Sequence, residues 1–538
     1  MKIVKGKAVS GGVSFGHIHI LKSDAIISEE KTNDKKAQLK AFEEAKLIAN
    51  EELTLIYEKT VREIGQNEAD IIDVQRQFLV DPDLNDLVIS NIENDSDTAA
   101  FAVSRAGKDI SAMFSNMDDA YMKGRATDVA DLTSRLAGIL AGNRPDEVQL
   151  TKDAVIVAED ITPSQTLNLD KKLIAGFVTQ KGSDSSHSAI LARTLEIPSV
   201  VQADIVISDD IQGLPIAIDA DAGRVYIEPT QEIINLLAER NLDDIRSKAE
   251  LEALIGKETV TKSGRKLQIC ANIGGPDDME IVLKNDAEGI GLYRSEFLYL
   301  GRLDYPTEDE QYKAYSEVVE SMKGKSVVIR TMDIGADKKV EYFDLEEEEN
   351  PALGFRALRI CLDRVPMFRT QLRAIYRAAA RGEVWIMFPM VASIWEVRKC
   401  KSICEQVAAE LKEEGIEFGK PKLGIMIETP AAAVISDALA KEVDFFSIGT
   451  NDLTQYTLAV DRQNEALSKY LDKHHPALLK LIETVVKNGH REGIPVSICG
   501  ELGADLQLTK WYTEIGLDKV SVSPPSVLKV RKAVRELD

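Results

Sequence analysis

The sequence of 538 residues has few cysteines and lacks any long apolar run. Its five cysteines, Cys270, Cys361, Cys400, Cys404 and Cys499, show neither paired metal-ligand spacing nor a disulfide framework, which is typical of a reducing compartment. No apolar run reaches the roughly 18 residues of a membrane span, and the first residues lack the apolar stretch of a secretion signal. We therefore expect a cytoplasmic protein that does not enter a membrane.

The chain also has fewer positively than negatively charged side chains. The chain has 66 Lys and Arg against 89 Asp and Glu, so its formal net charge is -23. Such a surface disfavours nucleic acid and anionic lipid as partners and would attract a basic protein. At roughly 100 to 200 residues per domain, the length predicts about three domains.

Glycine and proline are almost absent between Glu29 and Gly142, where apolar residues recur at helical spacing. This predicts a helical domain at residues 25–143. Short β-branched runs on either side predict a small α/β domain made of residues 1–24 and 144–229, into which the helices are inserted. A charged helical stretch then predicts a linker at residues 230–259.

The rest of the chain, residues 260–538, alternates short apolar runs with segments of helical composition. Eight such units are the pattern of a (β/α)₈ barrel, also called a TIM barrel. The eight runs are LQICANI, GIGLYR, SVVIRTMD, VWIMFPMV, LGIMIE, VDFFSIGT, VSICGE and KVSVS.

Chemically useful side chains end or follow several of these predicted strands. They are Arg294, Arg330, Asp333, Glu428, Asn451, Asp452, Cys499 and Glu501. Because the active site of a TIM barrel lies at the carboxyl ends of its strands, we expect these residues to meet there. A single arginine at a strand end is usually a surface ion pair, but packing alone does not explain so many.

The residue types in this ring indicate a metal and an anionic ligand. Glu428 and Asp452 supply two carboxylates, the small protein contribution that Mg²⁺ accepts when substrate oxygens and water complete its coordination. Four cationic side chains could bind phosphate and carboxylate oxygens: Arg294, Arg330, Lys338 and Arg462. No GxxxxGK[ST] loop is present, so a phosphorylated acid is favoured over a nucleotide.

Cys499, at the end of the seventh run, has two interpretations. Its thiol could give a proton to a carbanion-like carbon, or it could be an inert buried cysteine. Spacing alone does not choose between them.

A second candidate site lies at a strand-to-helix junction, Gly182 to Ile190, with the sequence GSDSSHSAI. Its glycine, serines and helix amino terminus favour a phosphate group, and the imidazole of His187 could attack phosphorus. The alternative is a serine-rich cap followed by an ordinary histidine.

At these residues the chain resembles Enzyme I of the bacterial phosphotransferase system, the phosphoenolpyruvate–protein phosphotransferases. The segment VDFFSIGTNDLTQY at residues 443–456, continuing to Asp461 and Arg462, is similar to the barrel signature of this family nearly letter for letter. Further similar segments are EGIGLYRSEFL, IRTMDIGADK, NPALGFRALRICLDR, IMFPMV, GIMIETPAA and ICGE. The domain order agrees, so the resemblance covers nearly the whole chain.

The resemblance implies a reaction: phosphoenolpyruvate phosphorylates His187, pyruvate leaves, and the phosphoryl group passes to the phosphocarrier protein HPr, the first step of sugar uptake. It implies that Glu428 and Asp452 bind Mg²⁺ and that Cys499 protonates the enolpyruvate. Arg294, Arg330, Asn451, Asp452 and Arg462 would hold phosphoenolpyruvate, with Lys338 beside them. The helical domain would dock HPr near Arg125, and the barrel would form a homodimer.

Two departures from the family pattern keep a regulatory alternative open. Asp184 stands where an arginine is common, and Gln75 stands where a histidine is frequent on the helical docking surface. An acid beside a phosphohistidine should repel it, which would suit a weakly catalytic, phosphorylation-dependent binding module. A related enzyme that uses ATP is another alternative, although the chain lacks the large nucleotide-binding domain of such enzymes.

Overall fold

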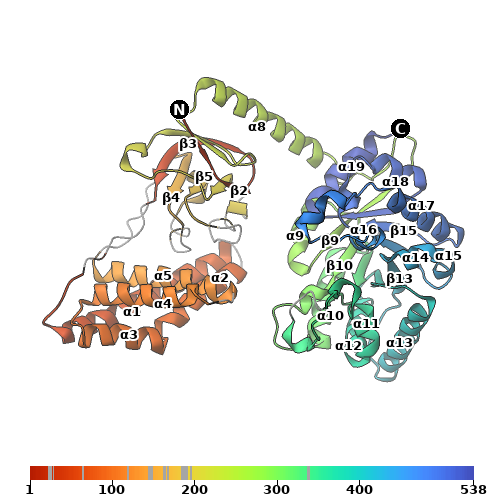
Figure 1. Ribbon diagram of the computed structural model, residues 1–538, viewed down its shortest axis with the longest axis horizontal. Coiled ribbons are helices and arrows are strands. Elements are labelled where there is room, and N and C mark those ends of the chain that lie inside the picture. The colour runs from red at the N-terminus through yellow and green to blue at the C-terminus, as the bar shows by residue number, and fades with distance from the viewer. Residues whose placement is uncertain are drawn as a thin grey trace. The chain divides into compact units, whose positions relative to one another are not determined.

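The computed structural model describes residues 1–21, 27, 29–63, 66–117, 120–142, 150–161, 165, 169–182, 189, 192–193, 197–335 and 340–538. The chain forms two compact units, residues 1–245 and residues 246–538 (Figure 1).

A sheet of eight strands forms the centre of the first unit, in the order β1-β8-β7-β3-β4-β5-β6-β2. The strands are β1 (Lys2–Lys5), β2 (Lys7–Ser10), β3 (Val13–Ile20), β4 (Ala154–Ala158), β5 (Ile174–Thr179), β6 (Ser199–Val201), β7 (Pro215–Asp219) and β8 (Arg224–Ile227). β3 pairs with β4 in parallel, with Ile18 opposite Val155. All the helices α1 to α5 lie between these two strands in the chain, so the predicted helical insertion into a small α/β fold is confirmed.

The inserted helices are α1 (Lys35–Glu63), α2 (Gln66–Leu79), α3 (Pro82–Glu93), α4 (Ala99–Ser115) and α5 (Ala120–Leu140). Asp81 begins α3, because its side chain accepts hydrogen bonds from the backbone of Asp83 and Leu84 at 3.0 and 3.2 Å. α4 and α5 approach closely at Gly107, where a Cβ atom would lie 2.0 Å from Thr133 Oγ1. The insertion therefore has a tightly packed core of its own.

The long helix α8 (Gln231–Glu252) follows the sheet. Its buried Leu237 packs against Val13, Ala217 and Tyr226 of the sheet, and Arg240 forms ion pairs with Asp219 and Asp221 at 2.9 and 2.8 Å. The sequence predicted a linker helix at this position.

The second unit is a closed barrel of eight strands in which every neighbouring pair is parallel. Its strands are β9 (Gln268–Ile273), β10 (Ile290–Arg294), β11 (Val327–Arg330), β12 (Val384–Phe388), β13 (Lys422–Ile427), β14 (Phe445–Gly449), β15 (Val496–Cys499) and β16 (Lys519–Val522). Each coincides with one of the eight apolar runs, with β13 beginning one residue before its run, so the predicted (β/α)₈ barrel is confirmed.

The barrel is surrounded by helices, and the sequence marks the start of two of them. α10 and α13 each begin with a capping box, Thr307 with Glu310 and Ser393 with Glu396. The helices are α9 (Met279–Lys284), α10 (Glu308–Ser321), α11 (Leu358–Asp363), α12 (Val365–Ala378), α13 (Ile394–Glu413), α14 (Pro430–Val434), α15 (Ser436–Leu439), α16 (Thr450–Leu458), α17 (Pro476–Arg491), α18 (Thr509–Ile515) and α19 (Val527–Glu536).

Inside the barrel, side chains that alternate along the strands form an apolar column. Trp385 and Phe445 come from the starts of β12 and β14, Met387 and Met426 from further along their strands, and Cys499 from the end of β15. The column thus separates two ends of the barrel that carry different polar groups.

Over the described ranges, no helix is both long and apolar enough to cross a membrane.

Candidate active site

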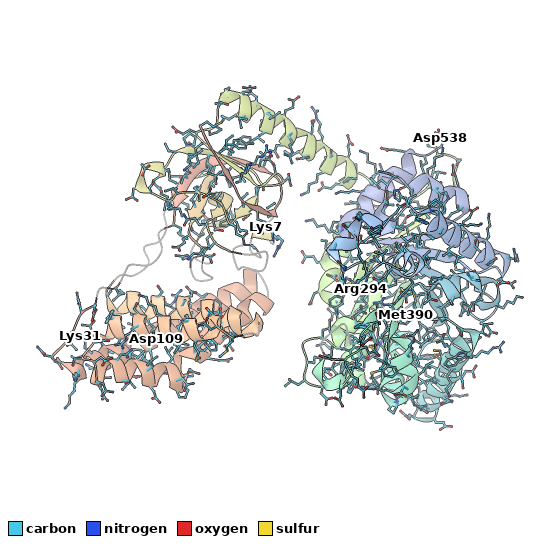
Figure 2. All side chains as sticks on the ribbon, in the orientation of Figure 1. Lys7, Lys31, Asp109, Arg294, Met390 and Asp538 are labelled. Atoms are coloured by element: carbon cyan, nitrogen blue, oxygen red, sulfur yellow. The ribbon has the colours of Figure 1, made fainter. Side chains whose placement is uncertain are left out.

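Most of the predicted site residues meet at the carboxyl end of the barrel. Arg294 and Arg330 are the last residues of β10 and β11, Glu428 directly follows β13, and Cys499 ends β15. Asn451 and Asp452 lie in the first turn of α16, which begins directly after β14. Arg294 is labelled in Figure 2, together with Met390, a residue that follows β12 at the same end of the barrel.

The two carboxylates predicted to bind metal are buried and lie close enough to interact electrostatically. Glu428 is 1% exposed and accepts a 2.6 Å hydrogen bond from the backbone of Met390. Burial raises the pKa of Glu428 to about 8, and the charges of Asp452 and Asp333 add to this effect. Asp452 is 8% exposed, and its Oδ1 atom accepts no hydrogen bond from the part of the chain described. A cation between these carboxylates would relieve both conditions.

The donor set fits a hard divalent cation. Among the residues that the structure describes, no group of three or more His, Cys, Asp or Glu side chains could enclose a metal. Glu428 and Asp452 would contribute two protein carboxylates and leave the other positions to substrate and water, as a small hard divalent cation allows.

Arg330 is held rigidly by two buried carboxylates. Its guanidinium contacts Glu296 at 2.6 Å and Asp333 at 3.0 Å. Burial by itself would lower the pKa of Arg330, but these carboxylates outweigh it and raise the pKa above its usual value. The guanidinium is therefore charged and oriented in advance for an anionic ligand.

Two residues of this network were missed by the sequence interpretation. Glu296 lies two residues after Arg294, and Arg356 lies within the segment NPALGFRALR, but neither was given a role. Arg356 donates to Asp333 at 2.8 Å and lies 3.8 Å from Asp452. In the sequence, the place of Glu296 and Arg356 in segments similar to the family was the signal that could have found them. The search for side chains at strand ends could not find Arg356, because this residue follows no strand directly.

Cys499 keeps its proton in this environment. It is 2% exposed, its Sγ accepts a hydrogen bond from Ser447 Oγ at 3.5 Å, and it donates to the Ile448 carbonyl at 3.5 Å. Burial raises the pKa of Cys499 to about 11. All five cysteines are buried, so burial alone does not single out Cys499. What distinguishes Cys499 is its place beside Glu428, Asp452 and Arg330, whose charges act on the thiol.

Gly500 allows the backbone to turn directly after Cys499. Its φ angle is 98°, and a Cβ atom would lie 2.5 Å from Thr450 Oγ1. The next residue, Glu501, donates its backbone N–H to the side chain of Asn451 at 3.2 Å. The turn thus joins the segment that follows β15 to the start of α16.

The remaining predicted residues are less constrained or lie elsewhere. Arg294 is exposed, 4.9 Å from the ring of Phe297, and Arg462 lies 4.0 Å from Asp452 with 37% of its side chain exposed. His187, Asp184 and Lys338 lie outside the described residues.

In the helical insertion, the two residues tied to partner docking have different surroundings. Arg125 of α5 contacts Asp128 at 3.1 Å with 18% of its side chain exposed. Gln75 of α2 is fully buried and donates to Asp131 at 2.8 Å. The expectation that Gln75 lies on a docking surface is wrong, because a side chain that satisfies a buried carboxylate is turned into the helical core.

Comparison with known proteins gives matches along the entire chain. The family patterns described as PEP-utilising enzyme, N-terminal, mobile domain and PEP-binding domain match residues 5–125, 150–223 and 248–538, in that order. Proteins named phosphoenolpyruvate-protein phosphotransferase are 41% identical in Priestia megaterium, 43% in Staphylococcus carnosus and 42% in Bacillus subtilis. Each comparison covers 100% of this chain and 94%, 94% and 95% of the respective relative.

Proposed function

Because the chain belongs to the phosphoenolpyruvate-protein phosphotransferase family of PEP-utilising enzymes, we propose that the barrel site binds phosphoenolpyruvate and that His187 accepts its phosphoryl group. The chain is an enzyme of phosphoenolpyruvate-dependent phosphoryl transfer in the phosphotransferase system, and it acts on a phosphocarrier protein. The identity extends over the full length, so it does not favour the regulatory alternative.

The observation that carries the assignment of the site is the cluster of Glu428, Asp452 and Arg330 beside Cys499 at one end of the barrel. Members of this family use a divalent metal, and we assign Mg²⁺ to Glu428 and Asp452. When bound, it would neutralise charge on the phosphate and on the enolate that forms. Arg330 binds substrate oxygens from a fixed position, and the exposed Arg294 and Arg462 close around the ligand with Asn451 and Lys338.

Phosphoryl transfer breaks the bond between phosphorus and the enol oxygen and forms a bond between phosphorus and a nitrogen of His187. The electron pair that remains on the enolate takes a proton at carbon from the Cys499 thiol, which yields pyruvate. Solvent then returns a proton to the thiolate. Since His187 and the barrel belong to different units of the chain, His187 must approach the barrel to collect the group and leave it to deliver the group.

We assign the role of phosphocarrier to HPr, which would dock on the helical insertion near Arg125. The acidic net charge of -23 supports a partner with a basic surface. We further propose that the enzyme works in the cytoplasm as a homodimer joined through the barrel. The domain limits inferred above, with the helical insertion as docking unit and residues 144–229 as carrier of His187, are part of the same proposal.

Labelled phosphoenolpyruvate tests the assignment. With Mg²⁺ present the enzyme should take up label, and addition of HPr should make pyruvate release continuous. His187→Ala should take up none, whereas His490→Ala, which removes a histidine on α17, should behave as the wild type. Label on another residue of His187→Ala, or a requirement for ATP, would refute the proposal.

A further inference from the structure

A tyrosine ties the loop between β11 and α11 to α16. Tyr456 of α16 donates its hydroxyl to the carbonyl of Ala352, in the turn that Pro351–Leu353 form within this loop. The same hydroxyl lies 4.0 Å from the sulfur of Met390, which follows β12. From a helix that follows one barrel strand, Tyr456 thus contacts the segments that follow two others.

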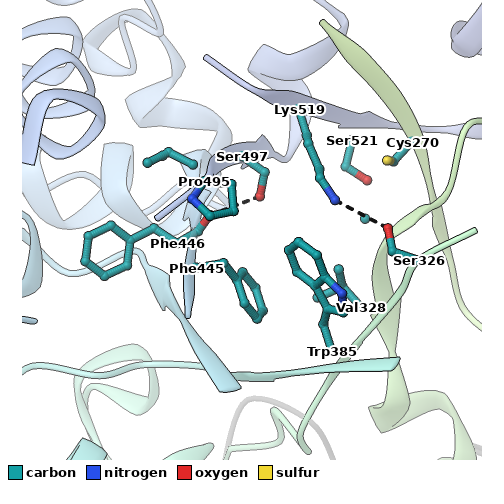
Figure 3. Close-up of a pocket in the computed structure, with 12 residues that line it drawn as sticks. Cys270, Ser326, Val328, Trp385, Phe445, Phe446, Pro495, Ser497, Lys519 and Ser521 are labelled. Carbon is teal, nitrogen blue, oxygen red and sulfur yellow. Dashed lines mark hydrogen bonds between the residues drawn. The ribbon is translucent and has the colours of Figure 1, made fainter. Parts of the chain in front are cut away.

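The helix that carries Tyr456 has a fixed position in the barrel. It begins directly after β14, whose first residue, Phe445, packs against Trp385 with ring centres 4.8 Å apart (Figure 3). Just past the other end of this strand, Thr450 donates its hydroxyl to the Cys499 carbonyl at 2.9 Å. Because the helix is anchored in this way, the loop is the part whose position Tyr456 can set.

The turn around Ala352 is held together by hydrogen bonds of its own. Leu353 donates its backbone N–H to the Asn350 carbonyl at 2.9 Å. Arg359 of α11 donates to the carbonyls of Leu353 and Gly354 at 2.7 and 2.6 Å. Because these bonds join the turn into one unit, a bond to the carbonyl of Ala352 holds the whole turn.

Movement of this turn would reach the substrate site through Arg356, which follows the turn in the chain. The guanidinium of Arg356 donates to Asp333 at 2.8 Å and lies 3.8 Å from Asp452. The other carboxylate oxygen of Asp333 contacts Arg330 at 3.0 Å. Asp333 therefore connects two buried guanidinium groups, and a displacement of one changes the support of the other. Asp452 and Tyr456 are four residues apart, so one face of α16 carries both contacts with this loop.

The hydroxyl of Tyr456 keeps its proton, as the bond to Ala352 requires. Burial raises the pKa of Tyr456; Arg356 opposes this shift, and the carboxylates of Asp452 and Glu428 reinforce it. The phenol is therefore a neutral donor at neutral pH.

We propose that Tyr456 is a positioning residue for phosphoryl transfer. By holding the Ala352 carbonyl, it keeps the loop after β11 against α16, and Arg356 and Asp333 then stay where they support Arg330. Tyr456 acts through this loop and not on the reacting atoms. The inference rests on the proposed function, because it takes Arg330 as a residue that binds phosphoenolpyruvate.

Tyr456→Phe tests this inference in the full-length enzyme, because it removes the hydroxyl and keeps the ring. Binding of phosphoenolpyruvate with Mg²⁺ is measured by equilibrium dialysis in the His187→Ala background, in which bound substrate is not consumed. We expect the dissociation constant to rise about five- to tenfold, the usual effect of losing one hydrogen bond. With His187 present, the single-turnover rate at saturating substrate should change less than about twofold, since the groups that act on the reacting atoms are intact.

Tyr312→Phe is the matched control. It removes a hydroxyl that accepts a hydrogen bond from Arg381 at 3.2 Å on α10, away from the strand ends. The dissociation constant of this variant should stay within about twofold of that of the wild type.

Amide hydrogen exchange of the substrate-free enzyme gives an independent readout. Residues 350–356 should exchange faster in Tyr456→Phe, whereas α17 should exchange as in the wild type. Exchange at residues 350–356 that does not rise, an equal loss of affinity in Tyr312→Phe, or a lower melting temperature with wild-type affinity would overturn the proposal. Exchange needs no substrate, so it tests the positioning even if the wild type fails to bind phosphoenolpyruvate, a result that would count against the proposed function instead.

Discussion

Cys499 has the surroundings of a general acid rather than of a nucleophile. A hydroxyl and a carbonyl engage its Sγ, and no base is among its hydrogen-bond partners in the described structure. Burial raises the pKa of Cys499 to about 11, so the protonated form is the one present at neutral pH.

The pH dependence of pyruvate formation follows from this shift. An acid with a raised pKa holds its proton to higher pH, so the protonation step should not decline between about pH 6 and pH 9. We expect Cys499→Ser to form pyruvate at least about a hundredfold more slowly in single-turnover experiments, because its hydroxyl is a much weaker acid. Cys400→Ser, a buried cysteine on α13, should retain the wild-type rate. A decline centred near pH 8 that vanishes in Cys499→Ser would contradict the assignment.

Glu428 and Asp452 form a pair whose mutual repulsion a metal would remove. We expect Glu428→Gln to lower phosphoenolpyruvate turnover on the order of 10³-fold, because the transition-state charge loses its metal. Without metal and at neutral pH, the variant should be about as stable as the wild type, since the raised pKa of Glu428, about 8, already leaves most of this carboxyl uncharged.

Differential scanning calorimetry in EDTA and then in Mg²⁺ measures both effects. The wild type should gain stability on addition of Mg²⁺ and Glu428→Gln should not. Glu414→Gln, which removes an exposed partner of Arg373, is the control and should respond to Mg²⁺ as the wild type does. An equal gain in Glu428→Gln would mean that the metal binds elsewhere.

At the scale of elements, the last helix of the barrel is fastened by one fully buried arginine. Arg531 of α19 contacts the carboxylate of Asp286 and its backbone carbonyl, each at 2.6 Å, and donates to the Leu254 carbonyl at 3.0 Å. It thereby ties α19 both to the segment that follows α8 and to the turn after α9.

Replacing this arginine should strongly destabilise the barrel. We expect Arg531→Met to lower the free energy of unfolding by about 3 to 5 kcal/mol, because it leaves Asp286 without its buried partner. Lys532→Met, the next residue on the same helix, removes only an exposed pair with Glu250 and should cost less than about 1 kcal/mol. Urea unfolding followed by circular dichroism distinguishes them; equal losses would show that the contacts of Arg531 add nothing.

For the whole molecule, separate cores imply separable units. The barrel has one large core, whereas the helical insertion and the sheet of the first unit have their own. A molecule of this kind can position a phosphoryl acceptor and a substrate site independently and bring them together by domain motion.

A fragment of residues 246–538 should therefore fold, unfold cooperatively and bind phosphoenolpyruvate with Mg²⁺. It should take up no label, because it lacks His187. Calorimetry and equilibrium dialysis measure folding and binding, with the full chain as reference. Failure to bind substrate would mean that the first unit completes the substrate site.

The sequence by itself determined the eight strands of the barrel, the helical insertion into the small α/β domain, and the end of the barrel at which the site forms. Short, nearly continuous apolar runs mark the strands of the barrel, and parallel strands in a closed barrel must end on the same side, so Arg330, Glu428 and Cys499 could be assigned to one place. The signature around Asn451 and Asp452 could indicate the family from the sequence alone, because its residues are neighbours in the chain.

Only the tertiary structure decided which charges are paired. Glu296 and Arg356 join the site through residues distant in sequence, and Gln75 is turned inward by Asp131. Pairing and burial depend on which side chains meet when the barrel and the helical insertion close, and spacing along a chain does not contain that information.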